Sequence, residues 1–95
     1  MFERILVANR GAVAARIIRT AHRMGRKVGV VHSPCDAELP YVSTADFAVE
    51  ALGNRAVESY LSQDFILAAA HEHEVDAIHP GYGFLSENPA FARRC

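Results

Sequence analysis

The sequence predicts an α/β fold in which a Rossmann-like parallel sheet of about four strands is flanked by helices. Short apolar runs, typical of strands buried on both faces of a parallel sheet, alternate with stretches in which apolar residues recur at helical spacing. The connections are short, which indicates right-handed strand–helix–strand units. A chain of 95 residues corresponds to one domain, so residues 1–95 are expected to form a single unit.

The first strand–helix–strand unit occupies residues 4–32. The apolar run RILVA, from Arg4 to Ala8, predicts the first strand. Apolar residues at helical spacing predict a helix from Ala12 to Met24, and Gly25 after it is a typical C-terminal stop. The run KVGVVH, from Lys27 to His32, predicts the second strand.

The rest of the chain continues this alternation. We expect, in order, a turn at 33–36, a short helix after Pro40 within residues 39–45, a strand at 47–52, a helix from Ser62 to about Glu74, a strand at 77–79 and a helix from Asn88. Ser62 and Asn88 are suitable N-caps, and Pro89 suits the first helical position. The sequence stops soon after that last helix begins, so we expect a fragment of a longer protein.

The composition is that of an ordinary globular domain: 51% of the residues are hydrophobic, 22% are charged and the net charge is −1. This charge, with no aromatic residues between the basic ones, predicts no nucleic-acid partner. No apolar run approaches the ~20 residues of a membrane span, and the N-terminus lacks a secretory signal, so we expect a cytoplasmic protein with no membrane partner. Cys35 and Cys95 are expected to be free thiols.

The predicted topology also indicates where a ligand would bind. Doubly wound sheets bind ligands beyond the carboxyl ends of their strands, at the switch point where the strand order reverses. In the order 3-2-1-4 this point lies between the first and fourth strands. The loop Asn9-Arg10-Gly11 follows the first strand, and the loop HPGYGFLSEN, from His79 to Asn88, follows the fourth. We therefore expect these two loops to lie side by side.

Tyr82, between Gly81 and Gly83, is the candidate ligand-facing residue of the second loop. Glycine permits either a positive φ or a close approach of a ligand, and at Gly83 we favour close approach over positive φ. Tyr82 should then be partly exposed. The alternative is a turn that simply requires glycine, with Phe84 and Leu85 closing the edge of the sheet.

Other motifs argue against several classes of protein. The first loop has a single glycine, Gly11, where the dinucleotide fingerprint needs three, and it lacks the acidic residues of a receiver domain. His71 and His73 are two residues apart on a predicted helix and point in different directions, so no metal site is predicted. No catalytic residue is identified, and the lysines and acidic magnesium ligands that phosphoryl transfer requires are missing.

Three arginines, Arg16, Arg19 and Arg23, form what we call the arginine face. They lie at i, i+3 and i+7, so they share one side of the first predicted helix. Such a face is either solvated or a contact surface, and arginine is the cation favoured at interfaces.

Four phrases, RILVANRG, RIIRTAHRMG, SYLSQDFILAAA and AIHPGYGFLSEN, closely resemble the N-terminal domain of biotin carboxylases. These are the carboxylating parts of biotin-dependent acyl-CoA, pyruvate and urea carboxylases, and the resemblance covers essentially the whole chain. It implies a Rossmann-like, pre-ATP-grasp segment followed by an ATP-grasp part and a C-terminal part. In such enzymes MgATP and bicarbonate carboxylate N1′ of biotin through a carboxyphosphate intermediate, and a biotin carboxyl carrier domain or subunit presents the biotin.

For this chain the resemblance implies a position in the floor of the active-site cleft. Tyr82 and Gly83 match positions that face biotin, and Glu87 lies on the same rim. The first helix is part of the homodimer contact in many bacterial members, and Arg19 matches a contact position there. The groups that bind ATP, magnesium and bicarbonate belong to later segments, so the resemblance implies that these 95 residues bind none of these cofactors tightly and do not catalyse alone.

The sequence departs from the usual family pattern in three places. Ala12 stands where the family usually has glutamate, and Arg23 stands where it is often acidic, which argues against a family-like dimer. The segment before Ser59-Tyr60-Leu61 is one residue shorter than in many acyl-CoA carboxylases and is more similar to urea carboxylases. The alternative interpretation, from another class, is a free-standing Rossmann-like binding or interaction module.

Overall fold

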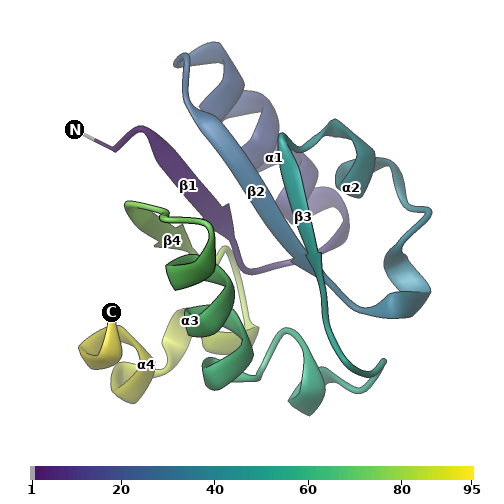
Figure 1. The fold of residues 1–95 in the computed structure, drawn as a ribbon, viewed down its shortest axis with the longest axis vertical. Helices are drawn as coiled ribbons and strands as arrows, with labels where there is room; N and C mark the ends of the chain where they lie inside the picture. The colour runs from purple at the N-terminus through teal and green to yellow at the C-terminus, as the bar shows by residue number, and fades with distance from the viewer. Residues whose placement is uncertain (1) are drawn as a thin grey trace.

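The computed structural model describes residues 2–95 and contains one sheet of four parallel strands (Figure 1). The strands are β1 (Arg4–Val7), β2 (Lys27–His32), β3 (Phe47–Glu50) and β4 (Ala77–His79), in the order β3-β2-β1-β4. The Rossmann-like sheet and the predicted strand order are confirmed. The switch point therefore lies between β1 and β4.

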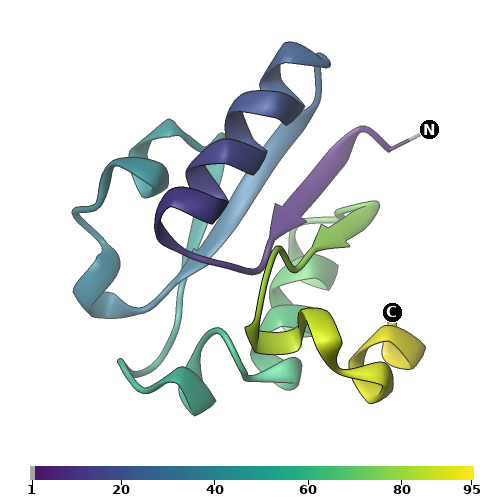
Figure 2. The same ribbon diagram turned by 180° about the vertical axis from the view of Figure 1, so that it is seen from behind.

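Helices lie on both faces of this sheet (Figures 1 and 2). They are α1 (Gly11–Arg23), α2 (Pro40–Thr44), α3 (Gln63–Glu72) and α4 (Pro89–Arg94), with short 3-10 helices η1 (Pro34–Asp36), η2 (Ala56–Glu58) and η3 (Phe84–Glu87) in the connections. α1 and α2 pack on one face, whereas α3, η3 and α4 pack on the other. The arrangement has the three layers expected of an α/β fold.

The predicted helix ends are present in the structure. The Oγ of Ser62 accepts a hydrogen bond from the N–H of Phe65 at 3.2 Å, and the Oδ1 of Asn88 accepts one from the N–H of Phe91 at 3.0 Å. Gly25 has a φ of +75°, the left-handed conformation that closes a helix at its C-terminus. The helix starts and stops thus follow from local sequence.

β3 is shorter than the strand predicted at 47–52. It ends at Glu50, which pairs with His32, the last residue of β2. The N–H of Ala51 donates one further hydrogen bond to the carbonyl of His32 at 2.8 Å, and Leu52 beyond it is fully exposed. β3 is an edge strand, so it ends where β2, its one neighbour, ends.

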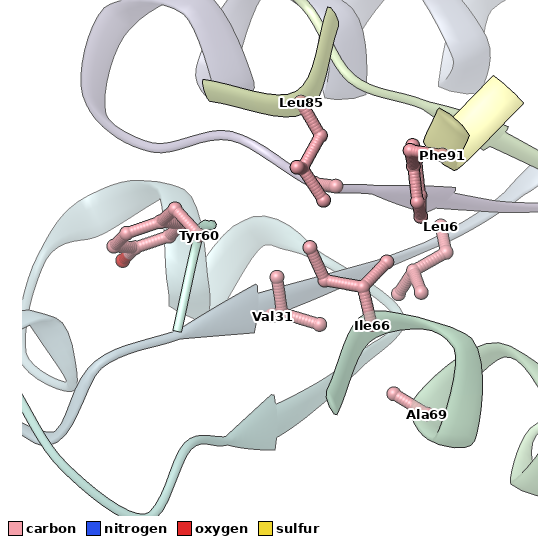
Figure 3. Packing of buried hydrophobic residues seen from close by; sticks show 8 residues of the cluster. Leu6, Val31, Tyr60, Ile66, Ala69, Leu85 and Phe91 are labelled. Atoms are coloured by element: carbon pink, nitrogen blue, oxygen red, sulfur yellow. The ribbon is translucent and has the colours of Figure 1, made fainter. Parts of the chain in front are cut away.

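Alternate strand residues enter opposite cores. Leu6 and Ala8 face α3, whereas Val7 between them faces α1. On the α3 side Ile66 lies between Leu6 and Val31 (Figure 3). All five side chains are almost completely buried, so the sheet is closed on both faces around β1 and β2.

Gly29 of β2 leaves room for an aromatic ring on the neighbouring strand. It pairs with Phe47 of β3, whose ring occupies the space that a Cβ at Gly29 would need. The Phe47 ring stacks on the His73 ring at 4.7 Å between centroids, and the Arg4 guanidinium lies 4.8 Å from its centre. The ring cannot move aside without losing these contacts.

We expect Gly29→Ala to destabilise the chain by about 1–3 kcal/mol, because the added methyl group overpacks this site. The measurement is the free energy of unfolding in urea. Gly53→Ala is the matched control, since the nearest atoms to a Cβ there belong to the end of the flexible Glu58 side chain, which can move aside. Equal stability of the two variants would contradict this account of Gly29.

Candidate functional site

The two loops at the switch point lie side by side, as predicted, and the side chain of Asn9 joins them. Its Nδ2 donates to the carbonyl of Pro80 at 2.7 Å and to the carbonyl of Tyr82 at 2.6 Å. Its Oδ1 accepts from the N–H of Arg10 at 2.8 Å. The backbone continues the contact, because the N–H of Ala8 donates to the carbonyl of His79 at 3.0 Å.

Gly81 is the glycine that allows this close approach. Its φ is +67°, and a Cβ there would lie 2.8 Å from Asn9 Nδ2 and 2.8 Å from Val13 Cγ1. Both conditions favour glycine. The close contact is made by Asn9 of the first loop and by Val13 of α1.

At Gly83 the structure has the positive φ that we did not favour, with a value of +64°. Among residues 2–95 nothing lies within 4 Å of the position of a Cβ, and the approach of a ligand to this glycine stays a prediction. The next residue, Phe84, also has a positive φ of 45°, which is uncommon outside glycine. The loop turns sharply at these two residues so that Phe84 and Leu85 can pack against the core, where Leu85 is buried.

Tyr82 is 75% exposed, which confirms the predicted exposure. It lies on the rim of an apolar groove of about 610 Å³ between α1 and the β4 edge, lined among others by Ile5, Val13, Ile17, Met24 and His79. The N–H of Gly81 donates to Nδ1 of His79 at 3.2 Å, which leaves the proton of a neutral ring on Nε2. Glu87 is exposed at the end of η3.

Arg10 joins the first loop to η1, which follows β2, through Asp36. Its Nε donates to Oδ2 of Asp36 at 2.7 Å, and its Nη2 donates to Oδ1 at 2.7 Å. Asp36 is 3% exposed, and its Oδ2 also accepts from the hydroxyl of Tyr60 at 2.6 Å. The hydroxyls of Tyr60 and Tyr41 are 2.8 Å apart. The two rings belong to cores on opposite faces of the sheet, so this cluster connects both cores at the switch point.

The charges of this cluster stabilise one another. The hydrogen bonds from Arg10 lower the pKa of Asp36 to about 2, and those same bonds raise the pKa of Arg10 above its ordinary value. Burial raises the pKa of Tyr41 and of Tyr60. At neutral pH the cluster therefore holds an ionised pair and two neutral phenols.

The sequence reasoning missed Asp36, Tyr41 and Tyr60. Asp36 follows the second strand, which the predicted strand order places next to the first, so the topology could have indicated a partner for Arg10. Nothing in the sequence pattern indicates the contact between Tyr41 and Tyr60, because their hydroxyls are brought together by the paths of the connecting loops.

The arginine face is exposed on α1, and Arg16 also lines the groove beside Tyr82. Cys35 and Cys95 are exposed free thiols. Within residues 2–95, no cluster of three or more His, Cys, Asp or Glu side chains is arranged to hold a metal ion. No helix in the same range is both long and apolar enough to span a membrane.

We expect Gly83→Val to lower the stability of the chain by about 1–3 kcal/mol, because valine adopts the conformation of Gly83 only with strain. For a domain of this size the melting temperature should fall by roughly 4 °C or more. Thermal unfolding followed by circular dichroism measures this. A melting temperature equal to that of the unmodified chain would show that the loop relaxes without cost.

We expect Asp36→Asn to lower the free energy of unfolding at pH 7 by about 2 kcal/mol, which corresponds to the lowered pKa of Asp36. Because its pKa is lowered in the folded chain, the Asp36 carboxylate stabilises the fold at pH values above its unfolded-state pKa of about 4. This stabilisation is lost as the pH falls through about 2. The difference between the two chains should therefore shrink over this range in urea titrations. Asp64→Asn is the control, since its ion pair with Arg94 is exposed and contributes little. A pH-independent difference would contradict the role of the ion pair.

Comparison with known proteins identifies the family of this chain. The family model described as biotin carboxylase, N-terminal domain, matches residues 1–95. Biotin carboxylase 2 of Bacillus subtilis is 47% identical over 95 residues, which are 100% of this chain and 21% of that protein. The chain thus spans about a fifth of the length of this relative.

Solved structures show the same fold. The Kluyveromyces lactis urea carboxylase has a TM-score of 0.97 and 49% identity over 99% of this chain and 8% of its own. The biotin carboxylase domain dimer of the Hydrogenobacter thermophilus 2-oxoglutarate carboxylase, solved with MgADP, ADP and bicarbonate, has a TM-score of 0.92 and 40% identity over 100% of this chain and 21% of its own. This chain belongs to the biotin carboxylase N-terminal domain family.

Proposed function

We propose that the chain is the first domain of a longer biotin carboxylase and forms the floor of the cleft in which MgATP and bicarbonate carboxylate biotin. The observation that carries the proposal is Tyr82, held at the switch point with most of its side chain exposed. Two findings support this proposal. The chain belongs to the biotin carboxylase N-terminal domain family, and it spans only a small part of each relative's length.

Tyr82, Gly83 and Glu87 are proposed to face biotin or to line the rim beside it. The fused rings of biotin are largely apolar and carry a polar ureido group, so an exposed phenol on the rim of an apolar groove suits them in both respects. When bound, biotin supplies the nitrogen N1′ that accepts the carboxyl group. The ring of Tyr82 would pack on the fused rings of biotin, and its hydroxyl would orient the ureido group.

The charges needed for phosphoryl transfer must come from the rest of the parent protein. Lys27 is the single lysine of the sequence, and it lies at the start of β2, at the opposite edge of the sheet from the switch point. Arg10 at the switch point is engaged by Asp36. The sites for ATP, magnesium and bicarbonate are therefore assigned to the ATP-grasp and C-terminal parts, and no catalytic residue to this chain.

The arginine face is proposed as a subunit contact in the full protein, which we expect to be cytoplasmic. Three exposed arginines on one helix would repel their copies across a two-fold axis unless acidic groups from elsewhere pair with them. The other proposed partner is the biotin carboxyl carrier domain, which brings biotin to Tyr82. The choice of the carboxyl acceptor, acyl-CoA, pyruvate or urea, is assigned to other parts of the parent protein.

We expect Tyr82→Ala, in a full-length protein that carries residues 1–95, to lower kcat/KM for free biotin by about tenfold or more, because the side chain that orients the acceptor is lost. Bicarbonate-dependent ATP cleavage measured without biotin should stay nearly unchanged. The isolated chain should show neither activity.

Leu52→Ala is the matched control, since Leu52 is a fully exposed apolar residue outside the site. Biotin kinetics that are unchanged in Tyr82→Ala would overturn the assignment of Tyr82. Turnover by the repurified isolated chain would overturn the division of function between this domain and the rest.

A further inference from the structure

Asn9 uses every hydrogen-bonding group of its side chain at the switch point. Both hydrogens of Nδ2 are donated, to the carbonyls of Pro80 and Tyr82, and Oδ1 accepts the N–H of Arg10. Asn9 is 3% exposed, so water cannot replace these bonds. Two donors and one acceptor in this arrangement require an amide.

The residues on either side of Asn9 are held in place. Ala8, which precedes it, is fully buried, and its N–H donates to the carbonyl of His79 in β4. On its other side Arg10 is fixed by two hydrogen bonds to the buried Asp36. The Asn9 side chain therefore has a defined place relative to β1, β2 and β4.

Within residues 2–95, the segment that Asn9 holds has few other anchors. The carbonyls of Pro80 and Tyr82 lie on either side of Gly81, whose N–H donates to Nδ1 of the exposed His79. Downstream, the first buried residue is Leu85. The bond from Asn9 to the Tyr82 carbonyl thus fixes the peptide plane between Tyr82 and Gly83, and with it the direction of the Cα–Cβ bond that carries the exposed ring.

We propose that Asn9 is a positioning residue for biotin, acting through Tyr82. The inference rests on the proposed function, in which Tyr82 faces biotin. Asn9 does not itself contact the ligand in this account; it fixes the Gly81–Tyr82 backbone so that the ring and hydroxyl of Tyr82 meet the acceptor in one orientation.

The test is Asn9→Asp in the full-length protein. The side chain keeps its size, but an ionised carboxylate has no hydrogen to donate and faces two carbonyl oxygens. We expect KM for free biotin to rise by about tenfold or more through misplacement of Tyr82, with bicarbonate-dependent ATP cleavage in the absence of biotin unchanged. Asn54→Asp is the matched control, because Oδ1 of Asn54 only accepts, from the N–H of Cys35, and a carboxylate preserves that bond.

A double-mutant cycle separates positioning from a general structural effect. If Asn9 acts through Tyr82, then Asn9→Asp adds no further loss in a Tyr82→Ala background. An additional loss there, equal to the loss in the unmodified protein, would overturn the inference. So would a normal KM for biotin in Asn9→Asp.

Gly81→Ala disturbs the same contact between Asn9 and the second loop, since the added methyl group would lie 2.8 Å from Asn9 Nδ2. It provides a second variant if Asn9→Asp does not fold, and the same rise in KM for biotin is expected. Failure of the proposed function itself gives a different result, namely Tyr82→Ala with unchanged biotin kinetics. A defective Tyr82→Ala together with a fully active Asn9→Asp and Gly81→Ala would overturn only the role of Asn9.

Discussion

The organisation of this domain depends on two consecutive polar residues at the carboxyl end of β1. Asn9 bonds to the loop after β4, and Arg10 bonds to Asp36 after β2. The two residues after β1 thereby fix the segments that follow β2 and β4, the two strands beside β1. The switch point of a doubly wound sheet is where neighbouring loops diverge and leave a crevice, so a rigid crevice requires side-chain contacts of this kind.

The same pair explains why polar groups can be buried so close to the hydrophobic cores. Asp36 is ionised and almost fully buried, and its oxygens accept bonds from Arg10 and Tyr60. Because Tyr60 gives its hydrogen to Asp36, Tyr41 donates its own to the Tyr60 hydroxyl. Within residues 2–95 no buried side-chain nitrogen or oxygen lacks a hydrogen-bond partner. A buried carboxylate costs little only when it is paired and hydrogen-bonded. Here Tyr60, from one core, bonds to the carboxylate, and Tyr41, from the core on the other face, bonds to Tyr60.

Sequence reasoning reached the strand order, the caps and the pairing of the two loops because each follows from a local rule. Serine and asparagine are favoured N-caps, so Ser62 and Asn88 mark the starts of the helices that follow them. An alternation of strands and helices with short connections is compatible with few topologies. The conformation of Gly83 could not be predicted, because glycine is compatible with both explanations and the choice depends on where Phe84 must pack. The contact between Tyr41 and Tyr60 depends on the paths of two loops, which no periodicity encodes.

The strained turn at Gly83 and Phe84 connects the exposed Tyr82 to the core. Two successive positive φ values turn the chain here, and their cost is offset where the Phe84 ring lies 5.1 Å from that of Tyr60 and Leu85 is buried. The loop is thus held by Asn9 at the carbonyls of Pro80 and Tyr82 and by the core from Leu85 onward, and the side chain of Tyr82 is left to solvent.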